Sequence, residues 1–327
     1  MLHQFMTNKF IEARHEKFDA PESLIFELVQ NSTGMSPIRR TKIVQGNDNE
    51  VYRVATQQEK NFIVRIKHYG EVTLAQEAWA IEQSKKAGVP VTEIFMLDKI
   101  TVGQGEREAM VCSEVPGKSL NILQEELPAG DWAQIVEDAG RTLRKIHSIK
   151  TDGFYHRQMD GSWDFKSWER LMEVTLQDRA SERQTILTAG FSDQDFDAML
   201  QVIQSYAKEF PCDQSVLCHG DYWQEHIFAT PDLKISGVID FGEFQGGPPI
   251  IDFAQGEEGS WFDLDMFKKG YADPALFDSE FDRRLNMQRL IMNMGYLAHH
   301  LRVNNTDEIP GNIAALRHTL AFLQNAA

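Results

Sequence analysis

The length and composition of the chain predict a globular protein of about two domains. It has 327 residues, of which 42% are apolar and 25% are charged; this ordinary mixture excludes a disordered or fibrous chain. Lysine and arginine number 33 against 49 aspartates and glutamates, so the formal net charge is −16. Such a surface repels nucleic acid and anionic membranes, which excludes a general binder of phosphate backbones but not a local site for an anionic ligand.

The cysteines and the start of the chain predict a reduced, cytoplasmic protein. Cys112, Cys212 and Cys218 form an odd, sparse set without metal-site or disulfide spacing. The first eighteen residues carry charges throughout and resemble no signal peptide, and no stretch approaches the roughly 18 apolar residues of a membrane helix. We therefore expect no membrane partner and no nucleic-acid partner, and either a monomer or a homodimer.

The first third of the chain carries most of the strand signals. We expect Asp19 to cap a helix that ends at the turn Asn31–Gly34, and Thr73 to Ala87 to form a second helix, ended by Gly88. Five runs rich in β-branched or aromatic residues predict strands: Thr41–Val44, Glu50–Ala55, Asn61–His68, Ile94–Leu97 and Ala109–Ser113. The chain breaker Pro116-Gly117 follows, and we place the domain boundary there.

The remainder of the chain is predicted to be mainly helical. Two sets of apolar residues recur at steps of three and four, which places each set on one helix face: Ile135, Ala139, Leu143 and Ile146, then Leu290, Met294, Leu297 and Leu301. The exception lies between residues 215 and 241, where three short β-like runs predict a small hairpin region: Val216–Cys218, Ile227–Ala229 and Ile235–Ile239.

This hairpin region also holds the densest group of reactive side chains. His219-Gly220-Asp221 is followed by His226, and Asp240 comes 19 residues after Asp221. Each aspartate follows a short apolar run, so a strand, a loop and a returning hairpin can bring both carboxylates and His226 together. Two carboxylates and a nitrogen ligand suit a hard divalent cation beside a catalytic base.

These motifs resemble a known family. "HGD" (219–221) followed by "IDFG" (239–242) is similar to the catalytic and metal-binding loops of aminoglycoside phosphotransferases and choline-kinase-like enzymes. "FIVRIK" (62–67), "EAWAIEQSKKAGVPV" (77–91), "MVCSEVPGKSL" (110–120), "AGRTLRKIHSI" and "GGPPIIDFA" resemble further family segments. The resemblance implies an α+β, two-lobed protein-kinase-like fold: an N-lobe at 1–113, a hinge at 114–118 and a C-lobe at 119–327.

The resemblance also implies roles for the catalytic and metal-binding residues. Asp221 accepts or orients the proton of the substrate hydroxyl, and Asp240 holds Mg²⁺ on the nucleotide phosphates. His226 stands where the family usually has asparagine, and macrolide phosphotransferases resemble this chain in having histidine there. An imidazole nitrogen replaces the amide oxygen as a metal ligand, and because it is softer it favours Mn²⁺ over Mg²⁺.

For the nucleotide, ATP or GTP, the resemblance implies three groups of contacts. Arg65 grips phosphate with Glu77 as its ion-pair partner, and Lys67, on the same strand face, is the reserve candidate. The hinge residues Ser113, Glu114 and Val115 contact the base. The turn at Gly46 and Asn47 lacks a full glycine-rich motif, yet its backbone amides are expected to cover the phosphates.

Three functions fit this pattern. The first is a kinase that transfers the γ-phosphoryl group of ATP or GTP to the hydroxyl of a small molecule such as an aminoglycoside, a macrolide, a sugar or an amino alcohol. The second is a metal-dependent hydrolase with His219, Asp221, His226 and Asp240 as ligands. The third is a non-catalytic, pseudokinase-like nucleotide-binding module. We read Asp252 as an acid that braces a loop or a helix start and not as a catalyst.

Overall fold

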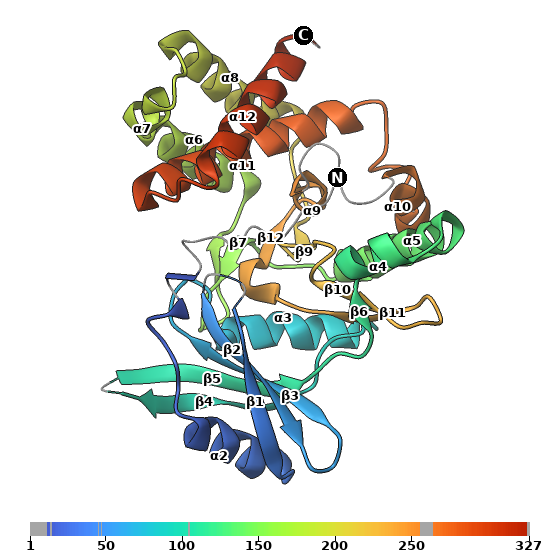
Figure 1. Ribbon diagram of the computed structural model, residues 1–327. Helices are drawn as coiled ribbons and strands as arrows, with labels where there is room; N and C mark the ends of the chain where they lie inside the picture. The colour runs from blue at the N-terminus through green and yellow to red at the C-terminus, as the bar shows by residue number, and fades with distance from the viewer. Residues whose placement is uncertain are drawn as a thin grey trace.

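A β-rich part and a larger helical part make up the fold in the computed structural model, as Figure 1 shows. The structure describes residues 12–13, 15–44, 46, 48–103, 105–255 and 264–325. The first part is one antiparallel sheet with a helix on each face. The second part consists of helices around two small sheets. The α+β class expected from the sequence is therefore confirmed.

The N-terminal sheet has five antiparallel strands in the order β1-β2-β3-β5-β4. Their bounds are Pro37–Ile43 (β1), Asn49–Thr56 (β2), Asn61–Lys67 (β3), Ile94–Val102 (β4) and Gly105–Ser113 (β5). Burial alternates along β3, because successive side chains of a strand point to opposite faces. Phe62, Val64 and Ile66 are buried in one hydrophobic cluster, which leaves Arg65 and Lys67 on the other face.

Helices α2 (Glu22–Thr33) and α3 (Leu74–Lys86) cover opposite faces of this sheet. Thr73 begins α3 with a capping box that it shares with Gln76. The expected cap of α2 is wrong: Pro21 stands at the capping position. Asp19 instead accepts a hydrogen bond from the Tyr52 hydroxyl at 2.8 Å, because two nearby β-strand side chains compete for its carboxylate.

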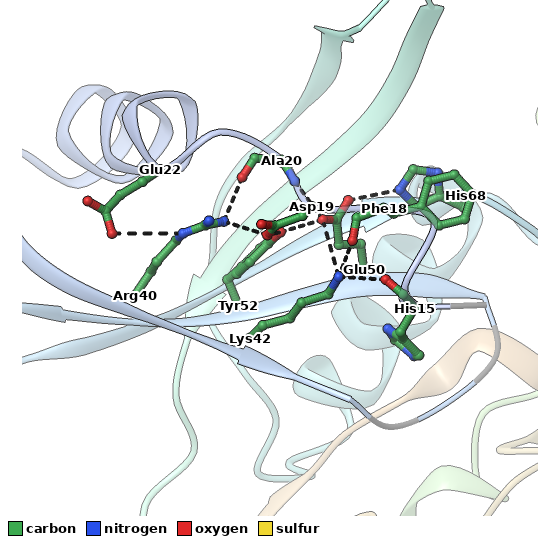
Figure 2. A network of polar contacts seen from close by, with 10 residues as sticks. All are labelled: His15, Phe18, Asp19, Ala20, Glu22, Arg40, Lys42, Glu50, Tyr52 and His68. Atoms are coloured by element: carbon green, nitrogen blue, oxygen red, sulfur yellow. Dashed lines mark hydrogen bonds and ion pairs between the residues drawn. The ribbon is translucent and has the colours of Figure 1, made fainter. Parts of the chain in front are cut away.

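A short segment before α2 is tied to the α2 face of the sheet by a polar network (Figure 2). The Lys42 ammonium donates to the backbone carbonyls of His15 and Phe18. Glu50 is 1% exposed, and its carboxylate accepts from the Ala20 amide at 2.7 Å and from the Tyr52 hydroxyl. The segment is thus fixed by buried hydrogen bonds that compensate for the desolvation of Glu50.

The C-terminal part contains nine helices within the described residues. They are α4 (Leu120–Glu126), α5 (Ala129–Ile146), α6 (Trp168–Ser181), α7 (Arg183–Thr188), α8 (Asp193–Glu209), α9 (Ile250–Ala254), α10 (Leu264–Tyr271), α11 (Phe281–Val303) and α12 (Ile309–Asn325). The two predicted apolar faces are confirmed on α5 and α11, except that Leu301 is only partly buried. Among the described helices, none combines the length and the apolar character needed to span a membrane.

The predicted hairpin region is divided between two sheets. One contains β6 (Lys118–Ser119), β10 (Ile227–Ala229) and β11 (Ile235–Val238); the other contains β7 (Phe154–Arg157), β8 (Trp163–Phe165), β9 (Val216–Cys218) and β12 (Gln245–Gly247). The prediction that these three strands form one hairpin region is therefore wrong, because β9 pairs with β12 and not with β10. Strands of two to four residues show too little periodicity for their pairing to be predicted. The exact bounds of the hinge stay a prediction.

Candidate active site

The HGD motif forms a tight loop directly after β9. The amides of His219 and Gly220 donate to the two oxygens of the Asp252 carboxylate, at 2.8 and 2.7 Å. Gly220 has φ +80°, and a Cβ there would lie 1.8 Å from the carbonyl oxygen of Glu243. Glycine is therefore required at this position, both for the left-handed backbone and for the close approach of the two loops.

His219 has a structural role in this loop. Its Nε2 lies 3.1 Å from the carbonyl oxygen of Ile239, and its Nδ1 accepts from the Asp221 amide at 3.2 Å. Burial lowers the pKa of His219 to about 4, so the ring is neutral near pH 7. Since both ring nitrogens are engaged with the backbone, His219 is not free to serve as the metal ligand that the hydrolase interpretation requires.

Asp221, His226 and Asp240 converge as the sequence predicted, and we call them the catalytic cluster. Their potential ligand atoms all lie within 4.8 Å of one another. His226 Nδ1 lies 3.0 Å from the Asp221 carbonyl oxygen, and Nε2 lies 3.7 Å from Asp240 Oδ2. With Nδ1–H donating to the carbonyl, Nε2 faces Asp240. Nε2 carries a proton while the ring is charged and offers its lone pair when the ring is neutral, and the neutral ring has the orientation of a metal-binding imidazole.

The charges of the catalytic cluster shift its pKa values in different directions. Burial, followed by the charge of Asp240, raises the pKa of Asp221 to about 6 although His226 opposes this. Burial also acts to raise the pKa of Asp240, but Arg65 and His226 hold it below its ordinary value. The two carboxylates therefore differ: Asp240 is the stable anion and Asp221 the more basic group.

Arg65 joins the sheet to the catalytic cluster. Its guanidinium binds Glu77 of α3 and, at 3.1 Å, Oδ1 of Asp240. The side chains of Arg65 and Glu77 are only 11% and 2% exposed. Burial acts to lower the pKa of Arg65, but Glu77 and Asp240 more than offset it and raise that pKa, so the guanidinium is always charged. The predicted pair of Arg65 and Glu77 therefore exists.

Two side chains from other segments, His15 and Lys67, contact the turn between β1 and β2. Gly46 has φ +74°, and its carbonyl oxygen lies 3.0 Å from His15 Nε2. Lys67, the reserve candidate for phosphate, lies 3.4 Å from the Asp48 carboxylate in the same turn. Asn47, which the sequence also assigned to the nucleotide, lies outside the described residues.

The three candidate hinge residues leave two backbone groups available. The Ser113 amide donates to the Glu93 carbonyl at 2.8 Å, and the Glu114 amide donates to the Asn61 carbonyl at 3.3 Å. Within the described residues, neither the Glu114 carbonyl nor the Val115 amide has a hydrogen-bond partner. An acceptor followed by a donor along an extended backbone suits the edge of a purine base.

Three residues that support the catalytic loop were not identified from the sequence: His147, Gln255 and Tyr296. His147 Nε2 lies 2.8 Å from the Asp252 carboxylate, whose bracing role was predicted. Gln255 donates to the Gly220 carbonyl, and the Tyr296 hydroxyl donates to Gln255 Oε1 at 3.0 Å. His147 occurs within a family-like segment, which was a usable signal, whereas nothing in the spacing of Gln255 and Tyr296 indicates their contact.

The sequence as a whole was also compared with known proteins. A family model described as the phosphotransferase enzyme family matches residues 39–263, which is more than half of the chain. The chain belongs to the phosphotransferase enzyme family. The resemblance inferred from HGD and IDFG is thereby confirmed, and this phosphotransferase carries those motifs within the matched range. A comparison with curated proteins finds no match.

Solved structures with the same fold include several phosphotransferases. A thermostable mutant of aminoglycoside phosphotransferase APH(4)-Ia has a TM-score of 0.71 at 14% identity, covering 90% of this chain and 98% of that chain. A putative fructosamine-3-kinase from Thermobifida fusca has a TM-score of 0.63 at 17% identity, covering 90% and 98%. The GDP and kanamycin complex of APH(2")-IIia has a TM-score of 0.64 at 14% identity, covering 92% and 99%. At these identities the similarity shows the shared fold.

Proposed function

We propose that the protein is a small-molecule kinase that transfers the γ-phosphoryl group of ATP or GTP to a hydroxyl group. The observation that carries this proposal is the convergence of the catalytic cluster with the pair of Arg65 and Glu77. A basic side chain for phosphate, a pair of metal-binding groups and a base are the parts that phosphoryl transfer needs in one place.

The nucleotide is placed by contacts at both ends of β3. The Glu114 carbonyl and the Val115 amide receive the base, and the turn at Gly46 covers the phosphates. Arg65 binds phosphate oxygens through the part of its fork that Glu77 and Asp240 leave free. Related structures whose titles name AMP-PNP and ADP support a nucleotide at this site of the fold.

A divalent cation fits the donor set of Asp240 and His226. Oδ2 of Asp240 and Nε2 of His226 face each other. Mg²⁺ prefers oxygen ligands such as this carboxylate, whereas Mn²⁺ binds the carboxylate oxygen and the imidazole nitrogen together more readily. A cation bound there supplies positive charge to the phosphate oxygens of the nucleotide.

Asp221 acts as the base. Its carboxylate accepts the proton of the acceptor hydroxyl while the hydroxyl oxygen forms a bond to the γ-phosphorus. The bond between this phosphorus and the β–γ bridging oxygen breaks, and its electron pair leaves with the diphosphate product. Asp252 and Gln255 keep the loop rigid, so that Asp221 holds its place during the transfer.

A screen for acceptor-dependent release of ADP tests this function. Purified protein with ATP and Mg²⁺ or Mn²⁺ is offered a panel of aminoglycosides, macrolides, sugars and amino alcohols, since the titles of similar structures name hygromycin B, kanamycin and a putative fructosamine kinase. We expect at least one alcohol to raise ADP release above the rate with ATP alone. Nucleotide binding without turnover on any alcohol would instead identify a non-catalytic nucleotide-binding module.

A further inference from the structure

Among the described residues, one guanidinium that lies between α6 and α11 has no ion-pair partner. Arg179 of α6 is half-buried, and its Nε donates to the backbone carbonyl of Ile291 in α11 at 3.2 Å. In the part of the chain that the structure describes, Arg179 forms no ion pair, although Arg170 of the same helix and Arg302 of α11 each do. In a chain with 49 acidic residues, a half-buried cation left unpaired is a cost that a ligand can offset.

The surface of α11 is shaped to hold this guanidinium. A Cβ at Gly295 would lie 2.6 Å from Arg179 Nη2, so the guanidinium lies close against the surface of α11 at this glycine. Burial lowers the pKa of Arg179, although the charges of Tyr155, Asp178 and Glu182 act in the opposite direction. Within the described residues the two terminal amino groups of Arg179 have no hydrogen-bond partner, so both can donate to an anion.

An exposed tyrosine beside Gly295 connects the region of Arg179 to the catalytic loop. Tyr296, the residue after Gly295, is 42% exposed and hydrogen-bonds Gln255, which in turn binds the carbonyl of Gly220 beside Asp221. After burial, the charges of Asp221 and Glu243 raise the pKa of Tyr296, and Gln255 and Arg179 lower it. The charges of Arg179 and Asp221 thus act on the same phenol.

Tyr155 marks the same region from β7. It is 38% exposed, it lies opposite Gly246 of β12, and its φ of 68° is in the left-handed region. A bulky residue in this conformation is strained, and such strain is typical of functional sites. After burial, the charge of Glu71 raises the pKa of Tyr155 and that of Arg179 lowers it.

We propose that the acceptor of the phosphoryl group carries an anionic oxygen group that binds Arg179 while its reacting hydroxyl lies at Asp221. The anion is a carboxylate, or a phosphate or sulfate monoester, because the planar guanidinium donates two parallel hydrogen bonds to any of them. This inference rests on the proposed kinase function. It excludes purely polycationic acceptors, which would bring further positive charge to an unpaired arginine.

Matched pairs of alcohols that differ only in an anionic group test the proposal. Glycerate is compared with glycerol, gluconate with sorbitol, glucose 6-phosphate with glucose, and glucose 6-sulfate with glucose, by coupled detection of ADP. We expect at least one anionic member to exceed its neutral counterpart at least tenfold in kcat/KM. The pair of alcohols in which the anionic member is preferred shows whether the anion is a carboxylate, a phosphate or a sulfate.

The variant Arg179→Gln should then raise KM for the anionic acceptor about 10- to 100-fold, the usual loss for a charged hydrogen-bonded contact. KM for ATP should stay unchanged, and activity on the neutral counterpart should fall much less than activity on the anionic acceptor. Arg179→Lys should keep part of the preference because the charge is retained. Arg170→Gln, on an exposed arginine of the same helix paired with Glu173, is the matched control and should behave as wild type.

Two outcomes would overturn the proposal: a preference for neutral or polycationic alcohols, or equal losses on both members of a pair in Arg179→Gln. If no alcohol in the panel is turned over, titrations of malate, inorganic phosphate and sulfate are followed by thermal shift. At least one of these anions must then stabilise the wild type and not Arg179→Gln, and the absence of that difference also overturns it. Failure of ATP itself to bind would contradict the kinase function separately.

Discussion

Arg65 Nη2 lies 3.1 Å from Asp240 Oδ1, and this ion pair joins the third strand of the N-terminal sheet to the loop after β11. The same guanidinium binds Glu77 of α3. One arginine therefore connects three segments that are far apart in the sequence. The side chain proposed to bind phosphate and the carboxylate proposed to bind the metal are thereby fixed relative to each other.

Removal of this arginine should affect stability and nucleotide binding separately. Arg65→Ala leaves Glu77 buried without its partner, and we expect a loss of about 3 kcal/mol in the free energy of unfolding together with weaker ATP binding. The double variant Arg65→Met with Glu77→Leu should recover stability but not affinity. Denaturant unfolding and ATP titration measure the two effects.

The matched control for this experiment is Lys67→Ala, two residues away on the same strand face. Lys67 forms its ion pair with Asp48 and not with Glu77, so its loss should be the milder one in both measurements. A stronger effect of Lys67→Ala on ATP affinity would show that Lys67, and not Arg65, is the phosphate-binding residue.

His226 should determine which metal the enzyme prefers. His226→Asn replaces an imidazole by an amide oxygen, so we expect a working enzyme whose preference shifts from Mn²⁺ toward Mg²⁺. His226→Ala should lose more activity, because water then fills the position. Activity titrated with each metal gives the ratio of apparent constants, and an unchanged ratio in His226→Asn would mean that His226 is not a ligand.

The brace of the catalytic loop should affect kcat more than nucleotide binding. Asp252 holds the amides of both residues that precede Asp221, and His147 holds Asp252. Asp252→Ala leaves these amides unsatisfied and should lower kcat at least tenfold, with KM for ATP changed less than threefold. Steady-state kinetics measure both constants. A parallel loss in ATP affinity would mean that the substitution damages the fold at large.

Glu50 should make the stability of the N-terminal sheet sensitive to acid. Three titratable groups face its carboxylate: Tyr52, His68 and Lys42. Burial alone would raise the pKa of Glu50, but hydrogen bonds from His68, Tyr52 and the Ala20 amide lower it to about 2. The stabilisation is therefore complete above the unfolded pKa of about 4.5 and is lost as the pH falls from there toward 2.

The variant Glu50→Gln tests this dependence by denaturant unfolding at several pH values. It should be less stable than wild type by up to about 3 kcal/mol at pH 7, and the difference should shrink below pH 4.5. Glu82→Gln, on the exposed surface of α3, should show no such change. A difference that stays constant from pH 7 to pH 3 would contradict the role of ionised Glu50.

Prediction from the sequence succeeded where the signal is local or where a motif is dense. The spacing of apolar residues in α5 predicted which face of the helix is buried. The motifs HGD and IDFG predicted that two carboxylates and His226 come together, and the structure brings their ligand atoms within 4.8 Å of one another. The pair of Arg65 and Glu77 followed from its position in family-like segments. These features depend on residues close in sequence or on a pattern that occurs as a unit.

Prediction failed where contacts between distant segments decide the outcome. Asp19 was expected to cap α2, but it is drawn to Tyr52, a residue 33 positions later. The pairing of β9 with β12 and the contacts of Gln255 and Tyr296 likewise depend on how helices pack, which no local pattern encodes. Arg179 is notable because it forms no ion pair among the residues that the structure describes, and a sequence alone does not show which charges are paired.

Transfer of the γ-phosphoryl group to a hydroxyl, with Asp221 as the base, is tested most directly by ³¹P NMR of complete reactions. Wild type with ATP, metal and the acceptor found in the screen should convert the γ-phosphate into a phosphomonoester in equal amount to ADP. Asp221→Asn should bind ATP as wild type does while forming the ester about two to four orders of magnitude more slowly. ADP accompanied only by inorganic phosphate, or ester formed at the wild-type rate by Asp221→Asn, would contradict the account.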